Sequence, residues 1–193
     1  MSSKSWALLT VCVAAGVGNA LAVEAAEPNP VVAIRVEGAS GMNGVNLVRA
    51  QELATEIYAQ AGVTLRWITD EAGPADRALT IILTTIATAP RGISPESMGV
   101  APSPGDGTRG TTAYVFMDRV SSFASKNKVA AEYVLACGMA HEIGHLLLPP
   151  NAHHAMGIMR GSWHPALFPP KAPGIPSFPS EQARLLRIRA GGR

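Results

Sequence analysis

Residues 127–148 read NKVAAEYVLACGMAHEIGHLLL, and Pro149 and Pro150 follow directly. The apolar residues of this stretch recur at three- and four-residue intervals, which is typical of a helix. Proline lacks a backbone N–H and its ring clashes with the preceding turn, so it stops a helix. The sequence therefore predicts one long helix that the two prolines terminate.

Two histidines and a glutamate lie on this predicted helix. His141 and His145 are four residues apart, so both side chains project from one face, one turn apart, and can reach a single ion. Glu142 stands about 100° around the helix from His141, near enough to touch a water on that ion without binding the ion itself. We therefore expect two metal ligands and a general base here. A histidine pair satisfied by the core or by solvent is the alternative.

A third ligand is expected, because a catalytic zinc takes three protein ligands and leaves its fourth position to water. No aspartate occurs after Asp118, which excludes an aspartate as a downstream ligand. The downstream candidates are His153, His154, His164 and Glu181. The first two lie just beyond the turn that the prolines impose, whereas Glu181 lies far along a proline-rich segment, so a histidine is favoured.

The rest of the sequence, outside this long helix, predicts both strands and helices. Runs of β-branched and apolar residues predict strands over residues 31–38, 63–67, 78–87 and 111–118. Residues 44–62 carry apolar side chains at helical spacing and end at Gly62, which predicts an amphipathic helix. A last short helix is predicted over 180–190, with Ser180 as its N-cap. The order of these elements indicates an α+β domain.

Residues 90–111 are rich in proline and glycine. Within them, only Met98, Gly99, Val100 and Ala101 could form a strand, which we expect at the edge of the sheet because proline is confined to such positions. Residues 102–110, PSPGDGTRG, predict a mobile loop that follows this strand.

Three further residues of the long helix carry expectations about packing. Gly138 and Gly144 each weaken a helix by about 1 kcal/mol relative to alanine, so we expect close packing to require them. Cys137 lies one turn before His141, but a lone cysteine on an apolar helix is usually a small buried hydrophobe. We expect it not to bind the metal.

The N-terminal residues have the order of a secretory signal peptide. Lys4 precedes an apolar run over residues 6–17, and Ala20-Leu21-Ala22 provides a small-residue cleavage site. We therefore expect a signal peptide over 1–22, a single domain over 23–193, and a secreted or periplasmic protein. An uncleaved N-terminal anchor is the main alternative and a lipoprotein a weaker one. Cleavage would leave Cys137 as the only cysteine, and no later segment is apolar enough to keep the protein in a membrane.

Length and charge narrow the class of protein. A chain of 193 residues fits one domain with a substantial core. The formal net charge is +2, with acidic and basic residues interleaved, so no basic stripe marks a nucleic-acid surface. Nucleic acid is therefore not expected as a partner.

The motifs HEIGH at 141–145 and GIMR at 157–160 resemble those of the metzincin clan of zinc metallopeptidases. That clan extends H-E-x-x-H to H-E-x-x-H-x-x-G-x-x-H and follows it with a tight bend, the Met-turn, whose methionine lies beneath the zinc ligands. The resemblance assigns Met159 to this turn, with Met156 as the competitor. It implies a zincin-like α+β fold, with a twisted mixed sheet of about five strands, a backing helix, an active-site helix and an irregular C-terminal part.

The chain departs from the clan's pattern beyond His145. Leu148 stands at the glycine position and Asn151 at the third-histidine position. Since leucine does not suit a left-handed turn, the third ligand is expected later. We select His153, two residues further on, with His154 as the alternative.

The clan's tyrosine just after the Met-turn is also absent, because no tyrosine follows Tyr133. The negative charge of the transition state would then be stabilised by zinc, by backbone N–H groups, or by Arg160 or His164.

The resemblance implies an exported, bacterial-type zinc endopeptidase with one catalytic Zn²⁺. A peptide or protein substrate would add as a strand to Met98–Ala101, and the 102–110 loop would form a movable rim. The alternatives are an exported zinc-binding protein without turnover, such as a pseudoprotease, and a zinc hydrolase of small amides or cell-wall peptides. Three imidazoles also accept cobalt, nickel or copper, and the oligomeric state stays open.

Overall fold

The computed structural model describes residues 28–38, 44–68, 79–104, 108, 110–163 and 174–192. The predicted signal peptide over 1–22 lies outside these ranges, as do His164 and part of the 102–110 loop. Within the described ranges, no helix is both long and apolar enough to span a membrane.

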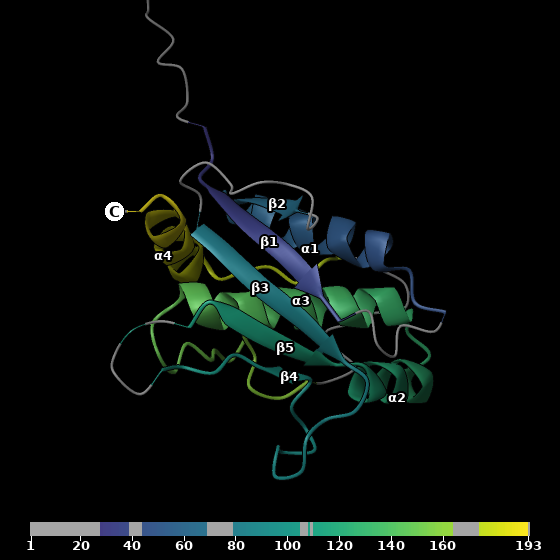
Figure 1. Ribbon diagram of the computed structural model, residues 1–193. Coiled ribbons are helices and arrows are strands. Elements are labelled where there is room, and N and C mark those ends of the chain that lie inside the picture. The colour runs from purple at the N-terminus through teal and green to yellow at the C-terminus, as the bar shows by residue number, and fades with distance from the viewer. Residues whose placement is uncertain are drawn as a thin grey trace, which may run out of the picture.

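The fold is built on a five-stranded, mostly parallel sheet (Figure 1). It agrees with the mixed sheet of about five strands expected from the sequence. Its strands lie in the order β2-β1-β3-β5-β4. The bounds are β1 Val31–Glu37, β2 Thr64–Ile68, β3 Leu79–Ile86, β4 Gly99–Val100 and β5 Thr112–Phe116. Only β4, at one edge, is antiparallel to its neighbour, with Gly99 opposite Val115. The predicted edge strand is therefore confirmed.

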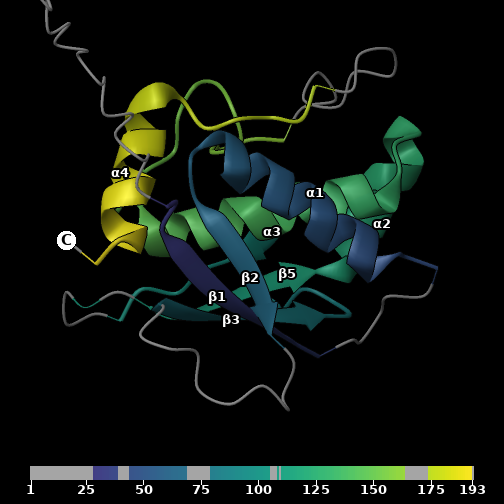
Figure 2. The ribbon, with the colours of Figure 1, turned by 90° about the horizontal axis from the view of Figure 1, so that it is seen from above.

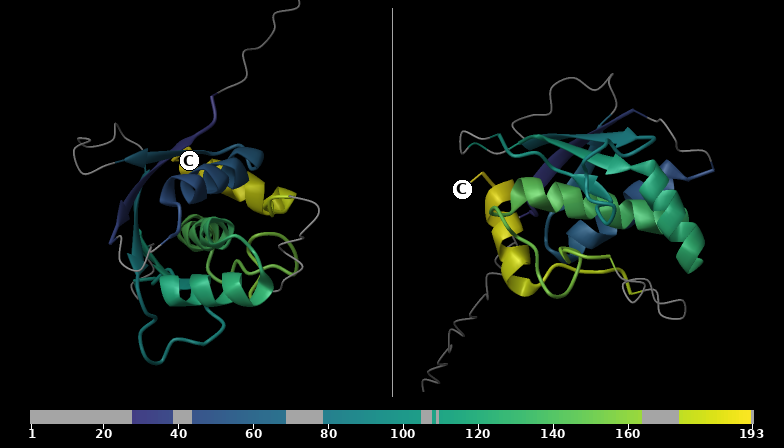
Figure 3. Two further views of the ribbon diagram at one scale, coloured as in Figure 1. Left: turned by 90° about the vertical axis from the view of Figure 1, so that its right-hand side faces the viewer. Right: turned by 90° about the horizontal axis from the view of Figure 1, so that it is seen from below.

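One face of the sheet is covered by helices, and this face forms the core (Figure 3, left). In β3 the buried residues Ile81, Leu83 and Thr85 alternate with partly exposed ones, which is the pattern of a strand with one covered face. The described helices are α1 Leu47–Gln60, α2 Met117–Asn127, α3 Ala131–Leu147 and α4 Ser180–Ala190. The α+β class predicted from the sequence is confirmed.

The long predicted helix is α3, and it runs through the middle of the molecule between α2 and α4 (Figures 1 and 2). Every residue from Val134 to Leu147 except His145 is buried. A helix that is apolar on all sides is a core helix, and the sheet and α1 pack around this one. The helix ends at Leu147, one residue before the predicted end at Leu148, and the two prolines follow.

The backing helix α1 lies within the predicted range 44–62, and its predicted stop at Gly62 is confirmed. The side chain of Asn46 caps its N-terminus by accepting a 3.0 Å hydrogen bond from the backbone N–H of Arg49. Gly62 follows the helix with a φ of 75°, in the left-handed region where glycine is favoured. Tyr58, on the buried side of α1, donates a hydrogen bond of 3.0 Å to the carbonyl of Ala140 in α3.

Helix α2 was missed by the sequence prediction, which ran a strand through Asp118. The strand β5 ends at Phe116 and the chain turns at once into α2. The Asp118 carboxylate accepts the backbone N–H groups of Ala89 and Arg119, which fixes this turn. Lys128 then adopts a left-handed φ of 55° and separates α2 from α3, so α3 begins at Ala131 rather than at 127.

The predicted N-cap of α4 is also wrong. Ser180 is the first residue of the helix, Pro179 occupies the cap position, and no side chain caps this end. The carbonyl of Pro179 accepts the N–H of Ala183 at 2.9 Å, which places Ser180 inside the first turn. Residues 149–163 and 174–179 contain no helix or strand, only an isolated bridge between His154 and Arg160, so the expected irregular C-terminal part is present.

Candidate metal centre

Three histidines converge at the C-terminal half of α3. His141, His145 and His153 each offer a ring nitrogen, and these three atoms all lie within 4.8 Å of one another. The Nε2 atoms of His141 and His145 are 3.0 Å apart. His153 comes from the segment after the helix, and its ring centroid lies 4.8 Å from that of His145 and 5.4 Å from that of His141. This group could hold a metal ion.

A backbone carbonyl orients the first of these rings. Nδ1 of His141 lies 2.8 Å from the carbonyl oxygen of Ile158. Because a carbonyl oxygen only accepts, Nδ1 carries the proton and the lone pair of the ring lies on Nε2, which faces the other histidines. Such a partner on the far side of a ring fixes both its tautomer and its direction, as metal sites require.

Burial keeps the two helical imidazoles neutral. Loss of solvation lowers the pKa of His141 to about 4, and the same cause, with His141 and His153 nearby, lowers the pKa of His145 to about 4. Both rings are therefore uncharged at neutral pH, each with a proton on one nitrogen only. An imidazole must be neutral to bind a metal, so the two nitrogens are available without the loss of a proton.

Glu142 lies beside the histidine group and is only 4% exposed. Burial raises the pKa of this carboxyl to about 8. Glu142 and all three histidines line one cleft of about 280 Å³, so the carboxyl faces the same space as the ring nitrogens. Gly99 of β4 lies against it: a Cβ atom at Gly99 would clash with the backbone oxygen of Tyr114 and lie 2.7 Å from Cγ of Glu142, so only glycine fits.

Met159 lies under the turn of α3 that joins His141 and His145. Its side chain is fully buried, and a Cβ atom at Gly144 would come within 2.5 Å of its sulfur. The backbone N–H of His154 donates to the carbonyl of Met159 at 2.8 Å, which closes a tight bend. Met156, the competing methionine, is 67% exposed on this bend and does not lie under the helix.

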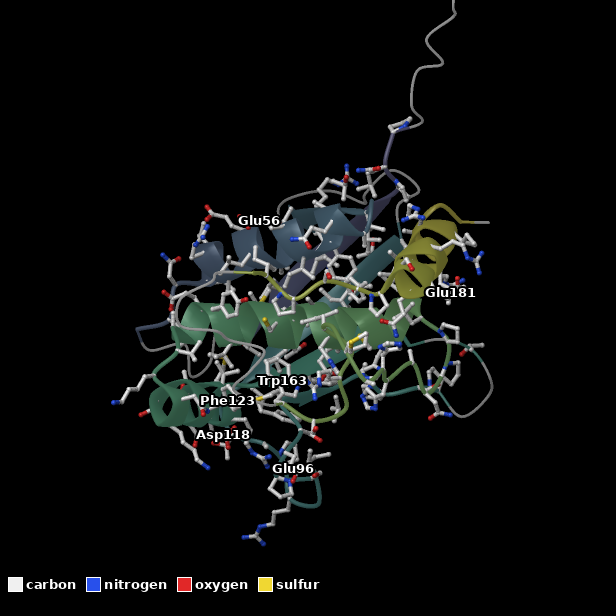
Figure 4. All side chains as sticks on the ribbon, turned by 180° about the vertical axis from the view of Figure 1, so that it is seen from behind. Glu56, Glu96, Asp118, Phe123, Trp163 and Glu181 are labelled. Carbon is white, nitrogen blue, oxygen red and sulfur yellow. The ribbon has the colours of Figure 1, made fainter. Side chains whose placement is uncertain are left out.

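The other candidate ligands lie apart from the group that could bind an ion. His154 is exposed, and its Nδ1 accepts the N–H of Met156 at 3.1 Å. Glu181 is exposed on α4, at a distance from Trp163 in Figure 4, and forms an ion pair of 2.8 Å with Arg184. Cys137 is buried, and burial raises the pKa of its thiol well above its ordinary value, as expected for a packed cysteine.

The cleft continues on both sides of the histidines. Its near wall is the segment Met98–Ala101, including the edge strand β4, whose outer side carries no neighbour in the described sheet. On one side it opens into a hollow of about 550 Å³ next to α2, where Phe123 and Trp163 meet edge to face with centroids 6.3 Å apart (Figure 4). On the other side a hollow of about 290 Å³ extends between Ala101–Ser103 and Pro150–Asn151.

Trp163 is a site residue that the sequence analysis missed. Its ring centroid lies 6.1 Å from that of His141, and it lines both the central cleft and the larger hollow. Its position so soon after the GIMR motif is the signal that could have identified it. Asn151, at φ 61°, takes the left-handed turn for which Leu148 is unsuited.

Comparison of the chain with models of known protein families gives no match, and comparison with curated protein sequences gives none either.

Proposed function

We propose that this protein is an exported zinc-dependent endopeptidase of the metzincin type. The observation that carries the proposal is the convergence of three imidazole nitrogens within 4.8 Å of one another, in a cleft that also contains Glu142 and is bounded by an edge strand. Each part has a role in peptide hydrolysis: the histidines hold a metal, the carboxyl moves a proton, and the strand binds a substrate backbone.

The donor set fits zinc. Three neutral nitrogen ligands and one position left for solvent or substrate form the common catalytic zinc site. Zinc–nitrogen bonds of about 2.0–2.1 Å in a tetrahedron hold ligand nitrogens about 3.3 Å apart, close to the 3.0 Å between Nε2 of His141 and of His145. Bound zinc would polarise a carbonyl oxygen and lower the pKa of a water toward about 7.

In this proposal, Glu142 acts as general base and then as general acid. It lines the cleft beside the histidines, and burial raises the pKa of its carboxyl to about 8. A positive charge on the histidine group would favour the carboxylate and bring this pKa down. The carboxylate would then accept a proton from water and deliver it to the departing amine.

The edge strand supplies a binding mode for an extended peptide. Its outer backbone groups have no strand partner in the described sheet, and β-strand addition satisfies such groups with those of a substrate. Gly99 allows the backbone of this strand to lie directly against Glu142. A substrate paired with Gly99 and Val100 would therefore carry a peptide bond past the carboxyl and the histidines.

Three features of the fold and sequence support the metzincin type. Met159 lies buried beneath the helical ligands in a tight bend, as the Met-turn of that clan does. The mixed sheet ends in an antiparallel edge strand that lines the cleft, and a long buried helix carries HEIGH. Residues 1–22, with their signal-peptide pattern, support export, which would leave residues 23–193 as the mature domain.

The test compares the zinc-loaded protein with Glu142→Gln on an unfolded protein substrate. We expect cleavage by the wild type, a loss of about 10²–10⁴-fold in rate for the variant, and one zinc bound in both. If both bind zinc and neither cleaves, the endopeptidase proposal fails. A panel of small amides and cell-wall peptides then distinguishes a hydrolase of small substrates from a zinc-binding protein without turnover.

A further inference from the structure

The three histidines are not held in the same way. His141 and His145 project from a buried helix, whereas His153 is exposed on the segment that follows Pro149 and Pro150. Asn151 and residues 154–156 on either side are exposed as well. Packing of side chains therefore gives His153 little support, and the position of its ring depends on what holds its backbone.

Among the described residues, one hydrogen bond holds the backbone on each side of His153. The N–H of His154 donates to the carbonyl of Met159 at 2.8 Å, within the bend itself. The carbonyl of Ala152 accepts a 2.7 Å hydrogen bond from the side-chain amide of Gln182, which belongs to α4. Of these two bonds, the second joins the residue before His153 to a part of the chain that is distant in sequence.

Helix α4 is firmly attached, so Gln182 reaches Ala152 from a fixed support. Leu186 of α4 is fully buried in the core. Arg187 donates to the carbonyl of Ala61 at 2.9 Å, which joins α4 to the end of α1. The Cα of Gln182 therefore has little freedom to follow a displacement of the 149–154 segment.

The side chain of Gln182 is only 9% exposed, and its amide is only half satisfied. Nε2 donates to Ala152, while Oε1 is buried without a hydrogen-bond partner among the described residues. A buried polar atom without a partner costs free energy, and an apolar side chain would fill the same space without that cost. What the amide of Gln182 adds at this position is therefore the hydrogen bond that it donates to Ala152.

We propose that Gln182 is a positioning residue of the metal centre, which holds the carbonyl of Ala152 so that His153 can complete the ligand set. The inference rests on the proposed role of His153 as a ligand. Groups that orient metal ligands through hydrogen bonds typically change metal affinity about 10–100-fold when they are removed. We expect an effect in this range.

The experiment measures zinc affinity by competition with a chromophoric chelator, using the full chain. Gln182→Met keeps the length and the burial but removes the donor. We expect its zinc affinity to fall about 10–100-fold, and the visible absorption bands of bound Co²⁺ to lose intensity as the three-histidine geometry loosens. The exposed neighbour Arg184→Gln is the matched control and should leave both readouts unchanged.

Unfolding of the metal-free proteins separates positioning from a general loss of structure. Gln182→Met should change stability little, because the cost of the lost hydrogen bond to Ala152 is offset by removal of the buried, unpaired Oε1. Wild-type affinity and an unchanged cobalt spectrum in Gln182→Met would overturn the proposal.

His153→Ala distinguishes failure of this inference from failure of the proposed metal centre. If His153→Ala binds zinc as the wild type does, His153 is not a ligand, and the three-histidine centre fails together with the inference. If His153→Ala weakens binding, Gln182→Met added to it should cause no further loss, since both would act through the same ligand. A full additional loss in the double variant would show that Gln182 acts by another route and would overturn the inference.

Discussion

The helix α3 and the segment from Pro149 to Arg160 both bring groups to the histidine cluster, but they differ in how they hold them. In α3, the ligands stand on a buried backbone whose own hydrogen bonds determine their spacing. In the later segment, the exposed residues around His153 are held by the hydrogen bond from His154 to Met159, by the one from Gln182 to Ala152, and by the left-handed turn at Asn151. The helix provides a rigid pair of candidate ligands, and the loop provides a third whose position depends on contacts with other segments.

The largest expected effect contrasts one ligand from each region. His141→Ala removes a buried ligand whose Nδ1 is bound to the carbonyl of Ile158, and His153→Ala removes an exposed one. Because a metal contributes several kcal/mol to catalysis, His141→Ala should reduce peptide hydrolysis by at least about 10³-fold.

His153→Ala should retain weak binding of zinc through the helical pair. Zinc titration of both variants, followed by a cleavage assay at saturating zinc, checks the contrast. Equal affinities in the two variants would show that the rigid helix gives no advantage.

The second prediction concerns the pH dependence of stability in the metal-free protein. The pKa of Glu142 is about 8 in the folded protein against 4.5 in a free chain, so between these values the native state binds more protons and stability falls as pH rises. The pKa values of His141 and His145 are about 4 against 6.5, so stability falls as pH drops from 6.5 toward 4. These three groups together favour a maximum near pH 6.5.

Glu142→Gln should remove the decrease above pH 6.5, since glutamine does not titrate. Urea unfolding at several pH values, in the presence of a chelator, gives the free energy of unfolding of the wild type and of Glu142→Gln. Parallel curves from pH 6.5 to 8 would contradict the raised pKa of Glu142.

Two glycines of α3 provide a matched test of how closely the later segment packs on the helix. Gly144→Ala would place a Cβ atom 2.5 Å from the sulfur of Met159, and overpacking of this kind costs about 1–3 kcal/mol. Gly138→Ala would meet Val115 at an ordinary 3.4 Å, so the close packing expected to require this glycine is not found. Alanine there would favour the helix by about 1 kcal/mol.

We therefore expect opposite signs in the free energy of unfolding: a loss for Gly144→Ala and no change or a gain for Gly138→Ala. Denaturant unfolding measures both. Equal stabilities would mean that Met159 can move away from the helix without cost.

The smallest expected effect tests the turn at Asn151. At a φ of 61°, asparagine is tolerated, glycine is favoured and alanine is strained by about 1–2 kcal/mol. Asn151→Ala should therefore lower both stability and zinc affinity slightly, and Asn151→Gly should stay close to the wild type. Thermal unfolding with and without zinc checks this order. If Asn151→Gly is as destabilised as Asn151→Ala, the asparagine side chain itself has a role at this turn.

Local sequence was sufficient wherever the geometry depends on neighbours along the chain. The four-residue spacing of His141 and His145 determines their common face as soon as the helix forms. The apolar runs of β1 and β3, the stop at Gly62 and the edge position of the Met98–Ala101 segment follow from propensity and turn chemistry in the same way. Helix α2 was missed because the apolar run of β5 continues into Met117, although Met117, Val120 and Ala124 have helical spacing.

Tertiary structure decided the rest, because those features depend on contacts between distant segments. The sequence offered both His153 and His154, and the turn at Asn151 with the bonds to Met159 and Gln182 turned the first toward the helical pair and the second away. Trp163 beside His141 and Gly99 against Glu142 likewise result from long-range packing. Sequence alone determined the chemistry and spacing within one helix, while the folded chain determined which distant side chains share its cleft.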